Sequence, residues 1–257
     1  MIFHQPHNSS SGYNYNAFFY ETEIWEPHFH KNFELIFVIR GSIVCTIGGK
    51  TFNLCENQFG LCLPYDIHSI KPNDHSLYWV MVFSSDFVRT FAKKIAGKRA
   101  TGFSFTCENS IKDFLISNLI NRKNPSVYML KSCLYAACNE FKESVNFTEN
   151  KEAENIGTIC LYLEEHHTEN ISLKSISNLL GYDYNYVSRY FHSVFNMSFT
   201  DFLNLYRLQT ALTLLEEKNK KIADIAFESG FKSVRNFNCF FKKSMGLTPT
   251  EYKNNTR

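Results

Sequence analysis

The sequence lacks the features that mark exported, membrane-spanning or thiolate-metal proteins. None of its eight cysteines belongs to a CxxC pair, and several stand among apolar residues, as in Ile43-Val-Cys45-Thr-Ile47. This setting is typical of buried reduced thiols rather than of a disulfide framework. No stretch approaches the roughly 18 uninterrupted apolar residues of a membrane span, and the N-terminus has no apolar run that resembles a signal peptide. We therefore expect a cytoplasmic protein without a membrane partner.

The chain also has little excess charge of either sign. Of its 257 residues 44% are hydrophobic and 20% are charged, and the formal net charge is +2. After Glu154 there are 12 Lys and Arg against 10 Asp and Glu. Any affinity for nucleic acid must therefore come from charges at particular positions and not from bulk charge. The length predicts one large domain or two ordinary ones.

The last third of the chain contains one short unit twice. Leu173 to Tyr182 matches Ile222 to Phe231 with a shift of 49, which places Gly181 on Gly230. In each copy a short apolar helix, a Gly-aromatic turn and a second helix with aromatic anchors follow one another. This order predicts a helix-turn-helix, here in tandem.

The residues around these units fit helix ends. Gly181 suits the end of the first helix, and a long helix from Thr200 to about Glu217 is expected to link the two units rigidly. Pro249 suits the first position of a final short helix. The residues expected to cap helix N-termini are Ser172, Asp183, Ser233 and Thr248.

The first half of the chain shows the period of two that is typical of strands. Between Ile24 and Phe83, β-branched and aromatic runs alternate with turns, and Gly48-Gly49 predicts a two-residue hairpin. Several short, closely spaced strands indicate a small barrel or jelly roll. Residues 1 to about 24, with Ser9-Ser-Ser-Gly12 as a flexible knot, are expected to form an arm.

From Ser110 the period approaches 3.6, which predicts two helices. A stripe on the second helix can pack against the barrel or against a partner helix, and we favour a homodimer contact for it. This stripe comprises Leu130, Leu134, Ala137, Cys138, Phe141 and Val145. The polar segment from Asn146 to Glu154 is the best candidate for a linker.

A cluster of candidate ligands begins at His28-x-His30-x-x-x-Glu34. The period of two places both histidines on one face of a strand, and Glu34 with His68 would complete a metal site at a barrel mouth. The spacing resembles the first cupin motif closely and the second loosely, with Asp66 where cupins have glycine. In cupins such a set holds iron, manganese or other divalent metals. We expect instead an organic effector pocket without metal, and an alternative in which His28 and His30 only bond to backbone stays open.

The expected effector site includes two aromatic residues besides this cluster. Ring stacking and hydrogen bonds to hydroxyl groups would suit a carbohydrate, and they would suit other small polar molecules as well. The expected effector-binding residues are Trp25, His28, His30, Glu34, Tyr65 and His68.

Three segments together resemble the signature of the AraC/XylS family of bacterial transcription regulators. They are Ile222-Ala-Asp-Ile-Ala-Phe-Glu-Ser-Gly-Phe231, Phe237-x-x-x-Phe241-Lys-Lys243 and Gly246-Leu-Thr-Pro-Thr-Glu-Tyr252. The resemblance covers about Ile156 to Tyr252, and the first half fits that family's effector-binding and dimerisation domain. It implies an α+β two-domain fold. The expected parts are a cupin-like β-barrel or jelly roll with two helices over 1–147, a linker over 148–154, and an all-α tandem helix-turn-helix domain over 155–257.

The resemblance implies a sequence-specific DNA-binding regulator without catalytic residues or cofactor. Its implied partners are double-stranded DNA, a small-molecule effector, a second copy of the chain and, for an activator, RNA polymerase. Lys242 and Lys243 are expected to contact phosphate. The family's base-facing positions fall on Asn185, Tyr186, Ser188 and Arg189 in the first unit and on Val234, Arg235, Asn238 and Cys239 in the second.

The second unit departs from the family's pattern. Cys239 stands where arginine is usual, and Asn236 where an aromatic residue is usual. This unit is therefore expected to read fewer bases and to anchor phosphate. Two other functions remain open from sequence: a cupin metalloenzyme, such as a dioxygenase or isomerase, fused to a DNA-binding domain, and a regulator that needs no ligand.

Overall fold

The structure of the protein is a computed structural model that describes residues 3–4, 14–149, 151–195, 197–217 and 220–255. The chain divides into two compact units, Met1–Gly157 and Thr158–Arg257. The boundary falls inside helix α4 (Lys151–His166), which starts in the first unit and ends in the second.

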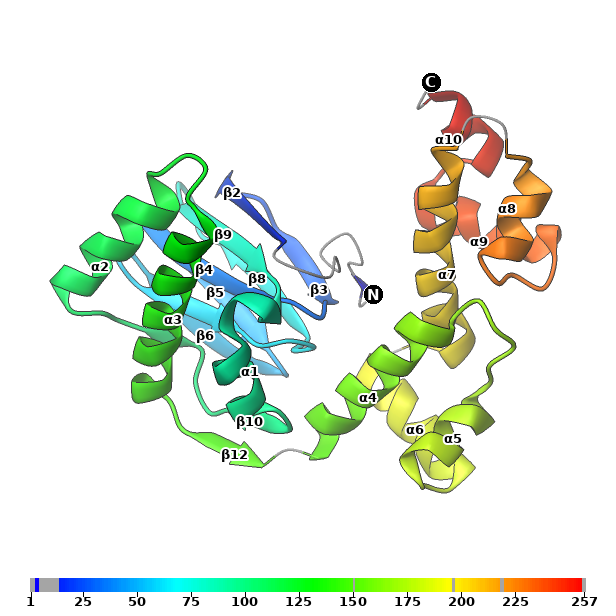
Figure 1. The fold of residues 1–257 in the computed structure, drawn as a ribbon, viewed down its shortest axis with the longest axis horizontal. Coiled ribbons are helices and arrows are strands. Elements are labelled where there is room, and N and C mark those ends of the chain that lie inside the picture. Colours follow the sequence, from blue (N-terminus) through cyan, green and yellow to red (C-terminus); the bar gives the residue numbers. More distant parts are fainter. Residues whose placement is uncertain (1–2, 5–13, 150, 196, 218–219, 256–257) are drawn as a thin grey trace. The chain divides into compact units, whose positions relative to one another are not determined.

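The first unit is built on two five-stranded sheets, drawn in blue to cyan in Figure 1. The first has the order β1 (Phe3–His4), β3 (Trp25–Phe29), β8 (His68–Pro72), β5 (Ser42–Ile47) and β6 (Lys50–Cys55). The second has the order β11 (Ser104–Phe105), β7 (Phe59–Cys62), β4 (Phe33–Arg40), β9 (Leu77–Phe83) and β2 (Tyr15–Glu21). Gly48 and Gly49, both with positive φ, form the predicted turn between β5 and β6. The predicted cupin-like β-barrel or jelly roll is confirmed.

The alternation along β4 decides which side chains line the inside of this double sheet. Ile36 and Val38 join one buried cluster with Ile43 and Cys45 of the other sheet. The alternate residues of the same strand face the opposite way. They are Phe33, Leu35 and Phe37, and they pack with helices in a second cluster. Because side chains alternate along a strand, Glu34 lies on the same face as Ile36, between the two sheets.

Helices cover the outer face of the second sheet. They are a 3₁₀ turn (Ser85–Val88), α1 (Arg89–Ile95), α2 (Asn109–Leu115) with a π-helical turn (Ile116–Ile120), and α3 (Val127–Ser144). The stripe on α3 packs into the same cluster as Phe33, Leu35 and Phe37. The preference for a homodimer contact through this stripe is therefore wrong, because the aromatic outer face of the sheet needs this cover.

Two segments differ from their sequence-based expectation through pairing with distant strands. Residues 15–21 of the expected arm form β2, which pairs along its whole length with β9. The expected linker contributes strand β12 (Phe147–Glu149), which pairs with β10 (Lys98–Ala100), and the start of α4. The ring of Phe147 contacts Phe91 and Phe141, which explains the ordered strand. The expected flexible knot at residues 9–12 lies outside the described residues.

The second unit is all helical, and in Figure 1 one helix pair lies near the start of a long helix and the other lies beside its later part. The first pair is α5 (Leu173–Leu180) and α6 (Tyr184–Phe195), and the second is α8 (Ile222–Glu228) and α9 (Val234–Met245). Helix α7 (Phe199–Leu215) connects them, and α10 (Pro249–Asn255) closes the unit. Among the residues that the structure describes, none of the helices is long and apolar enough to span a membrane.

Both helix pairs use α7 as part of their core. The ring of Phe202 near its start meets Phe191 of α6 edge to face and Phe195 of α6 at a tilt. Further along, Leu208, Ala211 and Leu215 pack in a cluster with α8 and α9. The predicted tandem arrangement with one shared linking helix is confirmed.

Candidate functional site

The N-terminus of α6 is fixed by its cap, so that its first turns present polar side chains. Oδ1 of Asp183 accepts hydrogen bonds from the backbone N–H of Asn185 at 2.8 Å and of Tyr186 at 3.4 Å. Gly181, at φ 71°, ends α5 in the left-handed conformation that glycine tolerates. Val187 and Phe191 are buried on one face. The opposite face exposes Asn185, Tyr186 and Arg189, and Ser188 is half-buried.

Helix α9 repeats this arrangement. Oγ of Ser233 accepts a hydrogen bond from the backbone N–H of Asn236 at 3.2 Å, as predicted for an N-cap. Phe237, Phe240 and Phe241 face the core. Val234 is half-buried, and the exposed residues of the predicted interface are Arg235, Asn238, Cys239, Lys242 and Lys243. The structure therefore places the two predicted sets on the solvent faces of two equivalent helices.

A tyrosine ladder along α6 extends the residues predicted from sequence. The rings of Tyr186 and Tyr190 are stacked, with centroids 6.1 Å apart and planes 9° apart. The ring of Tyr182 lies 5.1 Å from that of Tyr186. The helical spacing of four between Tyr186 and Tyr190 is the signal that would have shown this ladder in the sequence.

Buried contacts hold the two helix pairs to each other within the second unit. Arg207 of α7 is 4% exposed, and its guanidinium donates to the carbonyls of His167 at 2.8 Å and Glu169 at 3.0 Å. A Cβ on Gly230 would lie 2.6 Å from Cα of Thr168. The segment before the first pair therefore packs directly against the turn of the second pair.

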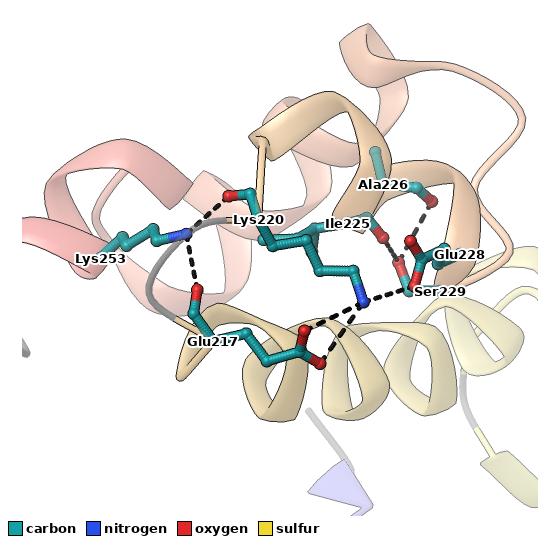
Figure 2. A network of polar contacts seen from close by, with 7 residues as sticks. All are labelled: Glu217, Lys220, Ile225, Ala226, Glu228, Ser229 and Lys253. Atoms are coloured by element: carbon teal, nitrogen blue, oxygen red, sulfur yellow. Dashed lines mark hydrogen bonds and ion pairs between the residues drawn. The ribbon is translucent and has the colours of Figure 1, made fainter.

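A second polar network ties the end of the chain to α7, as Figure 2 shows. Nζ of Lys253 on α10 donates to the carbonyls of Glu217 at 3.0 Å and Lys220 at 2.6 Å. Nζ of Lys220 forms ion pairs with Glu217 and Glu228 at 3.4 and 2.6 Å. These contacts fix the second helix pair relative to the connecting helix.

The predicted ligand cluster of the first unit is assembled between the two sheets. His28 of β3 pairs directly with His68 of β8, and Glu34 comes from β4 of the opposite sheet. One ligand atom from each of His28, His30, Glu34 and His68 lies within 4.8 Å of every other. All four residues are between 1% and 4% exposed. The sequence spacing therefore predicted a real cluster.

Each histidine of the cluster has its Nδ1 against a backbone carbonyl. The partners are the carbonyls of Glu26 for His28 at 2.8 Å, of Asn32 for His30 at 3.0 Å, and of Asp66 for His68 at 2.8 Å. The Nε2 atoms of His30 and His68 point toward Glu34. Nε2 of His30 lies 3.1 Å from Oε2 of Glu34, and Nε2 of His68 lies 3.5 Å from the same oxygen.

Burial and neighbouring charges shift the pKa values of the cluster residues in different directions. Burial lowers the pKa of His28 to about 3, and the nearby His68 adds to this effect. Burial alone would raise the pKa of Glu34, but the attraction of His68 and the hydrogen bond with His30 hold it well below its usual value. Burial opposes protonation of His68, yet the charge of Glu34 raises its pKa. The carboxylate thus stays ionised in a nearly dry site.

The other expected effector residues occupy different positions around the cluster. The Trp25 ring is half-buried, 6.0 Å from the ring of His28. Tyr65 joins through its backbone, since its N–H donates to the carbonyl of His30 at 2.8 Å. Sequence reasoning missed Cys45 and Cys62, whose thiol pKa values are raised by burial and by the charge of Glu34. Cys62 pairs with Glu34 in the sheet, a relation that only the register reveals.

Two family models match the chain, one in each unit. The AraC-like ligand binding domain matches residues 19–139, and a helix-turn-helix domain matches residues 176–255. An HTH-type transcriptional regulator of Staphylococcus aureus strain MSSA476 is 32% identical over 98 residues, which are 38% of this chain and 13% of that protein. The HTH-type regulator YtdP of Bacillus subtilis strain 168 is 31% identical over 124 residues, 46% of this chain and 16% of that protein. The chain thus spans a small part of the length of these curated relatives.

Solved structures resemble the fold over nearly the whole chain. A structure of ToxT from Vibrio cholerae has a TM-score of 0.59 at 17% identity and covers 95% of this chain and 98% of its own. A ToxT structure with bound unsaturated fatty acid has a TM-score of 0.58 at 16% identity, with 95% of each chain covered. With both matched domains in the order of this fold, the chain combines an AraC-like ligand-binding domain with a helix-turn-helix domain, which is the domain architecture of the AraC family.

Proposed function

We propose that the protein binds a specific DNA site with α6 and α9 in successive major grooves, and that a small ligand in the first unit changes this binding. The DNA part of the proposal rests on one observation. Helices α6 and α9 both have capped N-termini and expose polar side chains, and α7 connects their two helix pairs. Helices placed one helical turn of DNA apart, about 34 Å, can read two such grooves.

In this proposal Arg189 and Arg235 read guanine edges, because a guanidinium matches the two acceptors of guanine in the major groove. Asn185 and Asn238 pair with adenine edges, and Lys242 and Lys243 contact phosphate. Tyr186, Ser188, Val234 and Cys239 complete the contact faces. Cys239 offers only a weak donor, so the half of the site under α9 is expected to tolerate more bases than the half under α6.

The ligand part of the proposal rests on the buried polar residues between the sheets of the first unit. Three imidazoles and a carboxylate there have few polar partners besides each other and backbone carbonyls. ToxT with a bound unsaturated fatty acid shares the fold and supports a small ligand for this chain as well. Carbohydrate stays a prediction, as does the homodimer, which the mass of the protein in solution would reveal.

Selection of binding sites from a random duplex library, followed by fluorescence anisotropy, tests the DNA part. Arg189→Ala is expected to weaken binding to the selected site by about 1–3 kcal/mol and to relax the base preference at one position. Arg122→Ala removes an exposed arginine of the first unit and is the matched control. Selection that returns no shared motif would overturn the proposal. An equal loss on random DNA would reduce Arg189 to a backbone contact.

A further inference from the structure

We propose that Tyr186, held between Tyr182 and Tyr190 on α6, contacts the C5-methyl group of a thymine and so selects thymine in the half of the DNA site under this helix. The inference rests on the proposed function, because it names one base that the site must contain. It gives the aromatic surface of α6 a role that the hydrogen-bonding side chains of the same helix do not cover.

The ring of Tyr186 is packed between two other rings. Its centroid lies 5.1 Å from that of Tyr182 and 6.1 Å from that of Tyr190. The two outer residues are half-buried, whereas Tyr186 is 45% exposed. The outer rings therefore support the middle ring and leave a large part of its apolar surface open to a ligand.

Backbone contacts fix the start of this ladder. The N–H of Tyr182 donates to the carbonyl of Ser177 at 3.2 Å, and its carbonyl accepts a hydrogen bond from Oγ of the same serine at 2.7 Å. Ser177 is buried in α5, and the N–H of Tyr186 donates to the cap residue Asp183. The middle ring is thus held before DNA arrives, and it loses little side-chain entropy on contact.

The equivalent helix of the second pair shows that the fold does not require an aromatic ring at this place. The repeat aligns the three tyrosines with Phe231, Asn236 and Phe240 of the second pair. Phe231 and Phe240 are buried and belong to its core, so the outer places support the fold there as well. Asn236 at the middle place is exposed. The exposed ring of Tyr186 is therefore free to serve binding.

The chemistry of the major groove selects the partner of this ring. Base edges there present hydrogen-bond donors and acceptors, and the C5-methyl group of thymine is the apolar group among them. Asn185 and Arg189 lie within about one turn of Tyr186 and suit the donors and acceptors. The ring suits the methyl group, because their contact removes apolar surface from water. Uracil lacks this group and offers no such gain.

The test uses the full chain and the duplex that the selection experiment returns. Each thymine of this duplex is replaced in turn by deoxyuridine, which removes only the methyl group. The half of the site under α6 is the half whose base preference changes in Arg189→Ala. One replacement in that half is expected to lower affinity about three- to fivefold, as the loss of one buried methyl group predicts.

Three variants link this effect to the ladder. Tyr186→Asn gives α6 the residue that α9 has at the equivalent place, and it is expected to bind the thymine and deoxyuridine duplexes equally. Tyr186→Phe keeps the ring and is expected to keep the difference between them. Tyr128→Asn removes a tyrosine of α3 that is 84% exposed, and this matched control is expected to behave as the unchanged chain does.

The inference fails if the half of the site under α6 contains no thymine, or if no replacement there lowers the affinity of the unchanged chain. It also fails if the difference between thymine and deoxyuridine persists in Tyr186→Asn. Lost binding in Tyr186→Phe without a deoxyuridine effect would instead assign the hydroxyl group to phosphate and overturn the thymine contact. All these results leave the proposed function intact, whereas a selection without a shared motif contradicts that function itself.

Discussion

At the scale of single residues, the second unit depends on a charged side chain that is kept away from solvent. Arg207 is 4% exposed and satisfies two carbonyls in the segment that follows α4. Burial lowers the pKa of its guanidinium, although an arginine stays protonated at any ordinary pH. Arg207 therefore acts as a clamp, because its two hydrogen bonds hold α7 against this segment.

Arg207→Met keeps much of the apolar length of the side chain and removes both hydrogen bonds. It leaves two carbonyls without their donor, and we expect a loss of about 1–3 kcal/mol in the free energy of unfolding. Denaturant unfolding followed by circular dichroism measures this loss. Arg235→Met removes an exposed arginine from the same unit and is expected to change stability by less than about 0.5 kcal/mol. Equal effects of the two substitutions would show that the clamp has no energetic role.

The histidine cluster shows what a sequence can and cannot reveal about a residue. The spacing of His28 and His30 placed both on one strand face, and His68 was found from a loose motif. The carbonyl at each Nδ1 could not be predicted, because it depends on the path of the loops at Asn32 and Asp66. These bonds bear on which ring nitrogen carries the proton, because a carbonyl at Nδ1 can only accept.

At the scale of elements, local signals predicted helix ends and turns well. Ser233 and Gly181 act as caps because their effect depends on the next few residues only, and the Gly48-Gly49 turn is equally local. Predictions failed where the partner is distant in sequence. The stripe on α3 has the spacing of a coiled coil, and only the aromatic face of β4 and β9 shows what it packs against.

Helix α10 is held by the ring of Tyr252 against Phe241 and by Lys253, and the contribution of the lysine can be tested. Lys253 is 7% exposed, and its Nζ donates to the carbonyls of Glu217 and Lys220 in the connection between α7 and α8. We expect Lys253→Met to destabilise the second unit by about 1.5–3 kcal/mol, since hydrogen bonds from a charged donor are lost. Thermal unfolding measures this, and Lys232→Met, an exposed lysine, is the control. Unchanged stability would mean that water replaces the ammonium group without cost.

At the scale of the whole molecule, the two-domain order was predicted correctly because each half has a distinct hydrophobic period. The boundary between the two domains was harder to predict from the sequence. The expected linker has polar composition, but Phe147 packs against Phe141 and Phe91 and continues the first unit as a strand. The edge strand β2 was missed for the same reason, since its pairing with β9 joins segments about 60 residues apart in the chain.

The low net charge of the whole chain leads to a prediction about salt. Since the formal charge is only +2, DNA affinity should depend on where cations lie. Each phosphate contact contributes about 0.9 to the slope of log affinity against log salt. Replacing Lys242 and Lys243 on α9 with alanine should therefore lower the magnitude of this slope by about 2. The loss of affinity should be similar on the selected site and on random DNA, because phosphate contacts carry no sequence information.

A matched pair of lysines separates position from bulk charge in this experiment. Lys93 and Lys94 are exposed on α1 of the first unit, and their replacement by alanine lowers the net charge equally, from +2 to zero. If the position of the lysines governs DNA binding, the variant without Lys93 and Lys94 keeps the salt slope of the unchanged chain. If both double variants lower the slope alike, the general field of the protein governs binding and the assignment of phosphate contacts to α9 is wrong. Because the two variants have the same net charge, screening of bulk charge acts on both alike, and a difference between their slopes reports the position of the lysines.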